Sequence, residues 1–190
     1  MEKKCISLLL MIILVFALCG CGNKQEIDAE NMMEAADSSS VAGAQKESEA
    51  AGLLFEIPEG FEEDGDLPGL YMSQDYQRDL ACIFYQEHEA QERRELLTED
   101  NIAPLMQEMY TELYGMEVTV EMIDFHKFRL DGYDGCRIET EITTDEAVLQ
   151  NIEYVIYTDE KSYSLTYRQR KSAGWAETFA QSADRLKIGK

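Results

Sequence analysis

The second half of this chain consists of extended segments joined by very short polar turns. Residues 136–142 alternate between apolar or small side chains at even positions and charged side chains at odd positions, which predicts a half-buried strand. The preceding run 131–135, Asp-Gly-Tyr-Asp-Gly, is a turn signal, and 159–161 predicts a hairpin turn between strands at 149–158 and 162–168. A parallel crossover needs a connection of about a dozen residues or more. The sequence therefore predicts an antiparallel sheet.

Two segments have the periodicity of helices that cover such a sheet. Apolar side chains between residues 97 and 115 recur every three or four positions, and Pro104 fits only near a first turn, so we expect the regular helix to begin close to Asp100. The second helix is marked by Trp175, Phe179, Ala183 and Leu186. We predict an α+β domain with an antiparallel sheet of about six or seven strands. One helix follows the third strand, another lies at the C-terminus, and both pack on the sheet faces.

The first twenty residues have the features of a targeting segment. Lys3 and Lys4 precede the uncharged apolar run 6–18. As a helix this run would span about 20 Å, short of the roughly 30 Å hydrocarbon core, which favours a signal peptide over a membrane-spanning helix. The sequence Leu-Cys-Gly-Cys that ends at Cys21 resembles a bacterial lipobox, in which the cysteine after a small residue receives a diacylglyceryl group. We predict a lipoprotein signal peptide at 1–20 and lipidation of Cys21; an ordinary secretory signal and an uncleaved anchor are the alternatives.

The composition changes twice after this leader. Residues 21–50 are acidic, contain the run Ser38–Ser40 and hold no aromatic residue, so they predict a disordered stalk behind the lipidated cysteine. Residues 51–190 hold every aromatic residue except Phe16 and predict a globular head.

The charge of the chain excludes some partners. There are 38 acidic and 17 basic residues, giving a formal net charge of −21. Such a chain repels the phosphates of nucleic acids and anionic lipid headgroups alike. We therefore expect no nucleic-acid partner, and attachment to a membrane through the diacylglyceryl anchor alone.

Cys82 and Cys136 are the head's two cysteines, and each lies in a predicted strand on the apolar side. An extracytoplasmic location permits a disulfide between them. Two separate buried thiols explain the same pattern, and both interpretations stay open.

Few other side chains indicate metal or catalytic chemistry. The acidic loop Glu59, Glu62, Glu63, Asp64 and Asp66 offers oxygen ligands for Ca²⁺, but its spacing differs from the twelve-residue calcium loop, and a solvated loop is the simpler interpretation. His88 lies in a polar stretch expected to be a loop, and His126 is expected to be hydrogen-bonded or at the surface. No nucleophile, zinc or nucleotide motif is present, so we expect no catalytic residues, no metal and no cofactor.

One basic cluster interrupts the acidic sequence near the end of the last long strand. Its members are Arg168, Arg170 and Lys171. They form a candidate surface for an acidic partner, although pairing with neighbouring carboxylates is the commoner use of such side chains.

The head resembles the Mog1/PsbP/DcrB-like group of domains. The resemblance covers Leu53 to Ile188 and depends on the opening motif Phe55-x-Ile57-Pro58-x-Gly60-Phe61, the strand Tyr163–Tyr167 and the closing pair Trp175 and Phe179. It implies an antiparallel sheet with helices on both faces. Members of this group are mostly accessory proteins that bind a partner, and several bacterial members are lipoproteins. No binding residues carry over from the group.

Together these features favour a non-catalytic, lipid-anchored accessory or binding module, exposed on the outer face of a bacterial cell membrane, with an unknown protein or envelope partner. A carboxylate-dependent cell-envelope hydrolase and a Ca²⁺-stabilised surface module are the alternatives.

Overall fold

A computed structural model describes residues 46–47, 52–89, 98–114 and 117–189. The described residues all belong to one compact unit. Its first strand, β1 (Lys46–Glu47), lies within the segment that the sequence assigns to the stalk. The predicted signal peptide and Cys21 lie outside the described residues.

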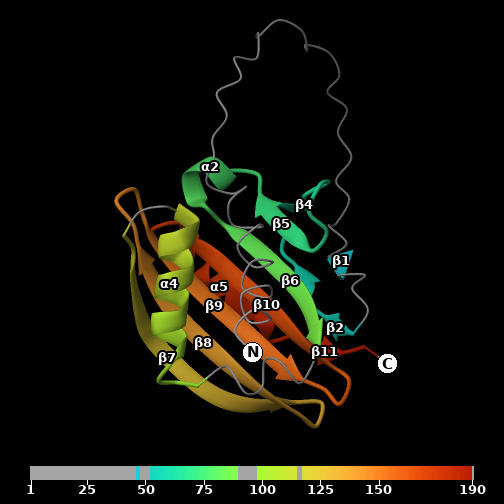
Figure 1. Cartoon of the computed structure of the whole chain (residues 1–190). Coiled ribbons are helices and arrows are strands. Elements are labelled where there is room, and N and C mark those ends of the chain that lie inside the picture. Colours follow the sequence, from blue (N-terminus) through green and yellow to red (C-terminus); the bar gives the residue numbers. More distant parts are fainter. Residues whose placement is uncertain (1–45, 48–51, 90–97, 115–116, 190) are drawn as a thin grey trace, which may run out of the picture. The chain divides into compact units, whose positions relative to one another are not determined.

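A seven-stranded antiparallel sheet forms the centre of the fold (Figure 1). Every pair of neighbouring strands in it runs antiparallel. In spatial order the strands are β4 (Phe61–Glu63), β5 (Leu70–Ser73), β6 (Cys82–Glu89), β10 (Lys161–Arg170), β9 (Val148–Tyr157), β8 (Tyr133–Thr143) and β7 (Thr119–Leu130). The prediction of an antiparallel sheet is confirmed, and β10 takes its central position.

The strands β7 to β10 are joined by the short turns that the sequence indicates. Asp131 and Gly132, with φ angles of 52° and 92°, connect β7 to β8. The hydroxyl oxygen of Thr158 accepts a hydrogen bond from the backbone N–H of Lys161, at 3.1 Å, in the turn from β9 to β10. A register shift next to Asp124 marks a bulge in β7.

The described chain contains three helices. α2 (Tyr76–Asp79) is a single helical turn. α4 (Ile102–Tyr114) has Pro104 in its first turn, as expected. α5 (Ala176–Ala183) ends before Leu186, which packs into the core beyond the helix. None of them is long and apolar enough to cross a bilayer.

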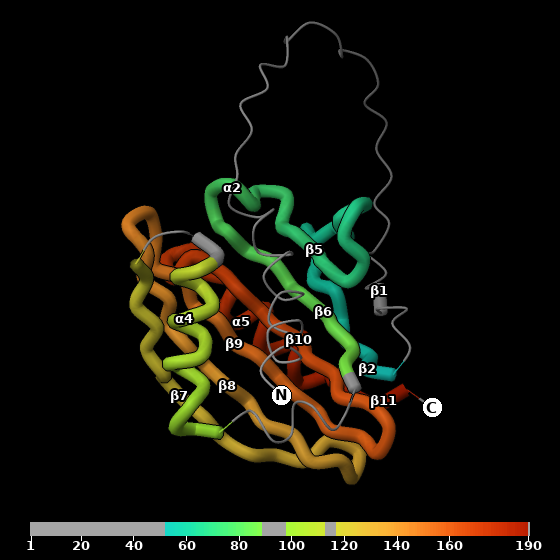
Figure 2. The backbone as a smooth tube through the Cα atoms, viewed as in Figure 1, coloured from blue at the N-terminus to red at the C-terminus, as the bar shows by residue number. Residues whose placement is uncertain are grey.

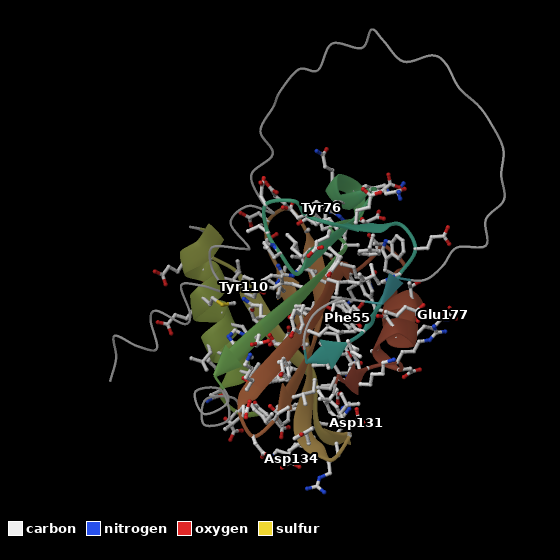
Figure 3. The ribbon with its side chains drawn as sticks, turned by 90° about the vertical axis from the view of Figure 1, so that its right-hand side faces the viewer. Phe55, Tyr76, Tyr110, Asp131, Asp134 and Glu177 are labelled. Atoms are coloured by element: carbon white, nitrogen blue, oxygen red, sulfur yellow. The ribbon has the colours of Figure 1, made fainter. Side chains whose placement is uncertain are left out.

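The helices α4 and α5 lie on opposite faces of the sheet. Seen edge-on, Tyr110 on α4 and Glu177 on α5 are on opposite sides of it (Figure 3). Phe179 of α5 belongs to the larger core cluster, which includes Leu165 and Tyr167 of β10. Ile102 of α4 belongs to a second cluster on the other face, with side chains from β8 and β9. The arrangement is α+β.

Two pairs of short strands complete the head. β2 (Leu53–Leu54) pairs with β11 (Lys187–Ile188), so the chain's last strand lies beside the start of the head (Figure 2). β1 pairs with β3 (Glu56–Ile57).

Candidate functional site

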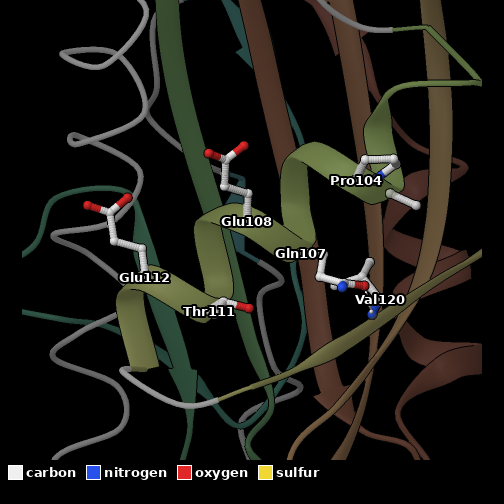
Figure 4. Close-up of a pocket in the computed structure, with 7 residues that line it drawn as sticks. Pro104, Gln107, Glu108, Thr111, Glu112 and Val120 are labelled. Carbon is white, nitrogen blue, oxygen red and sulfur yellow. Dashed lines mark hydrogen bonds between the residues drawn. The ribbon is translucent and has the colours of Figure 1, made fainter.

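An open groove with a volume of about 690 Å³ runs along the outer side of α4 (Figure 4). Its lining residues are Ala103, Pro104, Gln107, Glu108, Thr111 and Glu112 of α4 and Val120 of β7. Gln107 connects the two elements, because its side-chain oxygen accepts a hydrogen bond from the backbone N–H of Val120 at 3.4 Å. The carboxylates of Glu108 and Glu112 extend away from the helix.

The charged side chains of α4 are all negative. Glu108 and Glu112 are both exposed, stand four residues apart and have no lysine or arginine beside them anywhere in the helix. Like charges at this spacing destabilise a helix by about 0.2–0.5 kcal/mol. Glu112 also lies near the negative C-terminal end of the helix dipole. The stability of the helix therefore does not explain the two glutamates.

A buried arginine fixes α4 to the sheet. Arg168 of β10 is 3% exposed and points to the α4 side. Its Nε and Nη2 donate to the side-chain oxygen of Asn151 on β9, at 3.3 and 3.2 Å. Nη2 also donates to the hydroxyl of Tyr110, and the guanidinium carbon lies 5.3 Å from the centre of the Tyr110 ring. These contacts hold the helix, and with it the groove, in a fixed position.

The structure does not bring the predicted basic residues into one surface. Arg168 is buried, as described above, and Lys171 forms an ion pair with Glu141. The Nε of Arg170 donates to the backbone carbonyl of Arg78 at 3.0 Å. Arg170 and Lys171 line a second open groove, of about 570 Å³, at the turn between β8 and β9.

The acids of the predicted calcium loop are partly engaged by the loop's own backbone. Asp64 Oδ1 accepts hydrogen bonds from the N–H groups of Asp66 and Leu67, at 2.9 and 3.0 Å. Glu63 Oε1 accepts one from Gly69 at 3.0 Å. Across the described residues no three Asp, Glu, His or Cys side chains converge as a metal site would require.

Cys82 and Cys136 are not joined to each other. Cys82 lies on β6 and Cys136 on β8, and the strands β10 and β9 run between them. Three strand spacings amount to about 14 Å, whereas the Cα atoms of a disulfide lie within about 7 Å. Of the two interpretations left open by the sequence, the structure has two separate buried thiols.

The two histidines lie on different strands, His88 on β6 and His126 on β7. His88 is half-buried in β6 and lies opposite Ser162 of β10. The sequence predicts a loop for this polar stretch, but pairing with β10 extends the strand through it. His126 on β7 is exposed, and its Nδ1 lies 2.8 Å from Asp124 Oδ2. This hydrogen bond, together with Arg137, lowers the pKa of Asp124.

No known protein family and no curated protein matches this sequence. Among solved structures, the head is similar to the solution structure of cyanobacterial PsbP (CyanoP) from Synechocystis sp. PCC 6803. The TM-score is 0.58 at 14% identity, and the match covers 80% of this chain and 98% of that one. The fold is PsbP-like.

Two further structures are less similar. A protein from Bacteroides thetaiotaomicron VPI-5482 gives a TM-score of 0.47 at 10% identity, covering 77% of this chain and 49% of that one. Protein PA94 of unknown function from Pseudomonas aeruginosa gives 0.42 at 10% identity, covering 78% and 99%. The likeness to CyanoP shows the fold alone.

Sequence reasoning did not single out the groove along α4. The signal was present, since residues 102–114 contain two glutamates four positions apart and no basic residue. The sequence does not show that Val120 of β7 lies beside the helix and forms the second wall of the groove.

Proposed function

We propose that this protein is a lipid-anchored binding module on the outer face of a bacterial cell membrane and acts through a partner, without catalysis. The observation that carries the proposal is the cysteine motif at the end of the leader, with Gly20 before Cys21 and Leu18 three positions upstream. Two acyl chains are enough for stable anchoring, whereas one chain is not.

The proposed division of the chain follows from this anchor. The signal peptide covers 1–20, the acidic stalk 21–50 and the head 51–190. A flexible stalk of this length reaches about 30 Å. Because the head and the lipid headgroups are both negative, the stalk would hold the head away from the bilayer.

The fold and the surface of the head support a binding role. We assign the head to the Mog1/PsbP/DcrB-like group, with α4 and α5 as the helices that the resemblance places on the two faces. The assignment concerns the fold and adds no site residues. The open groove along α4, held in place by Arg168, provides a surface that a partner can reach.

Replacement of single cysteines tests the anchor. The wild-type chain is expressed in a bacterium with a labelled fatty acid, and the N-terminal peptide is analysed by mass spectrometry. We expect the label on Cys21, at the new N-terminus, and the protein in the membrane fraction. The Cys21→Ser variant should carry no label and remain uncleaved, whereas the matched Cys19→Ser variant should behave like the wild type. An intact Met1 or an unmodified Cys21 sulfur in the wild type would refute the proposal.

A further inference from the structure

The ion pairs found among the described residues lie away from α4. The ion pairs within the described ranges are Arg78 with Asp75 and Asp79, Arg129 with Asp134, Arg137 with Asp124 and Glu139, Lys161 with Glu87, Lys171 with Glu141, and Arg185 with Glu56. None of these pairs involves a residue of α4. The glutamates of the groove are thus left without a cationic partner inside the described head.

A second feature lies farther along β7, the strand that carries Val120. Three residues beyond Val120, the bulge in β7 includes Ile123, which is 50% exposed. No other large apolar side chain is exposed among the residues that the structure describes. A bulge redirects a side chain and is usually a selected feature. An exposed apolar side chain can pack against a partner that extends beyond the groove.

The geometry favours an extended occupant over a single ion. Glu108 and Glu112 are separated by about 6 Å along the helix axis. As stated above, no three acidic, histidine or cysteine side chains of the described residues converge as a metal site requires. The negative charge is therefore spread along the groove, and the rest of its lining includes neutral side chains such as Pro104 and Thr111.

We propose that the groove along α4, from Pro104 to Glu112 and continuing past Val120 to Ile123, binds a lysine- and arginine-rich segment of a protein partner. The inference rests on the proposed function, because it names the partner chemistry of that binding module. Each exposed ion pair contributes little by itself and is screened by salt. The interaction is consequently of moderate affinity and weakens as ionic strength rises, while Ile123 adds a contribution that salt does not remove.

A labelled basic peptide tests this binding. The full chain, purified in mild detergent, is titrated into a fluorescein-labelled peptide of repeated Lys-Ala pairs, and fluorescence anisotropy is measured at increasing salt concentration. We expect saturable binding that the matched Glu-Ala peptide does not show. The variant Glu108→Gln with Glu112→Gln should weaken binding about tenfold at low salt, as expected for two lost charge contacts. It should unfold at the same temperature as the wild type or higher, since it removes a like-charge pair.

The matched control removes the same charge elsewhere. Glu160→Gln with Glu177→Gln alters two exposed glutamates on other elements and should leave peptide affinity nearly unchanged. Equal weakening by the two double variants would show attraction to net charge alone and would overturn the proposal. So would absence of binding by the wild type, or displacement of the peptide by Ca²⁺ at matched ionic strength. The Cys21→Ser chain should bind the peptide like the wild type, so the groove and the anchor can fail independently.

Discussion

The indole N–H of Trp175 donates a hydrogen bond to the buried carboxylate of Asp79, with 3.0 Å between Nε1 and Oδ2. The other carboxylate oxygen accepts a hydrogen bond from Arg78 Nε at 2.8 Å. Asp79 ends α2 and Trp175 precedes α5, so one buried side chain joins two helices that are 96 residues apart. Trp175 is the chain's single tryptophan, and its fluorescence reports directly on this contact.

Acid is expected to break this contact and to destabilise the head. The hydrogen bonds from Arg78 and then Trp175 lower the pKa of Asp79 below its ordinary value of 3.8. A carboxyl group whose pKa falls on folding contributes stability that is fully present above the unfolded pKa and is lost as the pH falls through the folded one. Denaturation curves followed by tryptophan fluorescence should therefore show that the contribution of Asp79 to the free energy of unfolding is constant above about pH 5 and is lost below about pH 4.

Replacement of Asp79 separates its contribution from that of other acids. Asp79→Ala leaves the indole N–H without its acceptor and should lower the free energy of unfolding by about 1–3 kcal/mol at neutral pH. Asp75→Asn is the matched control, because Asp75 also contacts Arg78 but is exposed, and its loss should change stability by less than about 1 kcal/mol. Similar losses in both variants would contradict the role of the Trp175 hydrogen bond.

Gly69 should be far less replaceable than Gly132. Both have positive φ angles, 84° and 92°. A Cβ on Gly69 would lie 2.7 Å from the carbonyl oxygen of Tyr85, whereas a Cβ on Gly132 would have no atom within 4 Å apart from those of its chain neighbours. Gly132→Ala should cost about 1–2 kcal/mol for the left-handed backbone alone. Gly69→Ala should cost about 1–3 kcal/mol more, because backbone must move. Equal midpoints in urea denaturation would count against the close contact.

The sheet could be predicted because its signals are local. The alternation at 136–142 and the turn at Asp131 and Gly132 each depend on neighbouring residues, and the structure places strands and turn there. The polar end of β6 could not be predicted in this way. His88 is in a strand because Ser162 lies opposite it in β10, and that pairing joins residues far apart in the sequence.

The candidate site depends even more on distant contacts. Arg168 appears in the sequence as one of three neighbouring cations, yet strand alternation and burial give it a different environment from Lys171. Its partners, Asn151 and Tyr110, come from a neighbouring strand and from α4. The net charge of a segment can be read from the sequence, but which cations are buried and which acids stay exposed depends on the packing of the sheet.

Tyr110→Phe should loosen α4 without altering its apolar packing. The change removes the hydroxyl that accepts a hydrogen bond from the buried Arg168 and leaves the ring in place. We expect a loss of about 1–3 kcal/mol in the free energy of unfolding, the cost of a buried donor that loses its acceptor. Hydrogen exchange should rise in α4 before it rises in α5. Tyr133→Phe is the control, since its hydroxyl makes no hydrogen bond in the described structure; an equal loss there would contradict this prediction.

The two cysteines of the head should remain thiols even in an oxidising environment. Cys82 and Cys136 are 3% and 4% exposed and lie on strands separated by two others, so neither can reach the other without unfolding of the sheet. Iodoacetamide should modify neither residue in the native protein and both after denaturation without reductant, as judged by peptide mass mapping. Ser172→Cys, at an exposed position, provides the positive control and should react in the native protein. If Cys82 and Cys136 became reactive only after reduction, they would be bridged, and the strand order between them would have to be wrong.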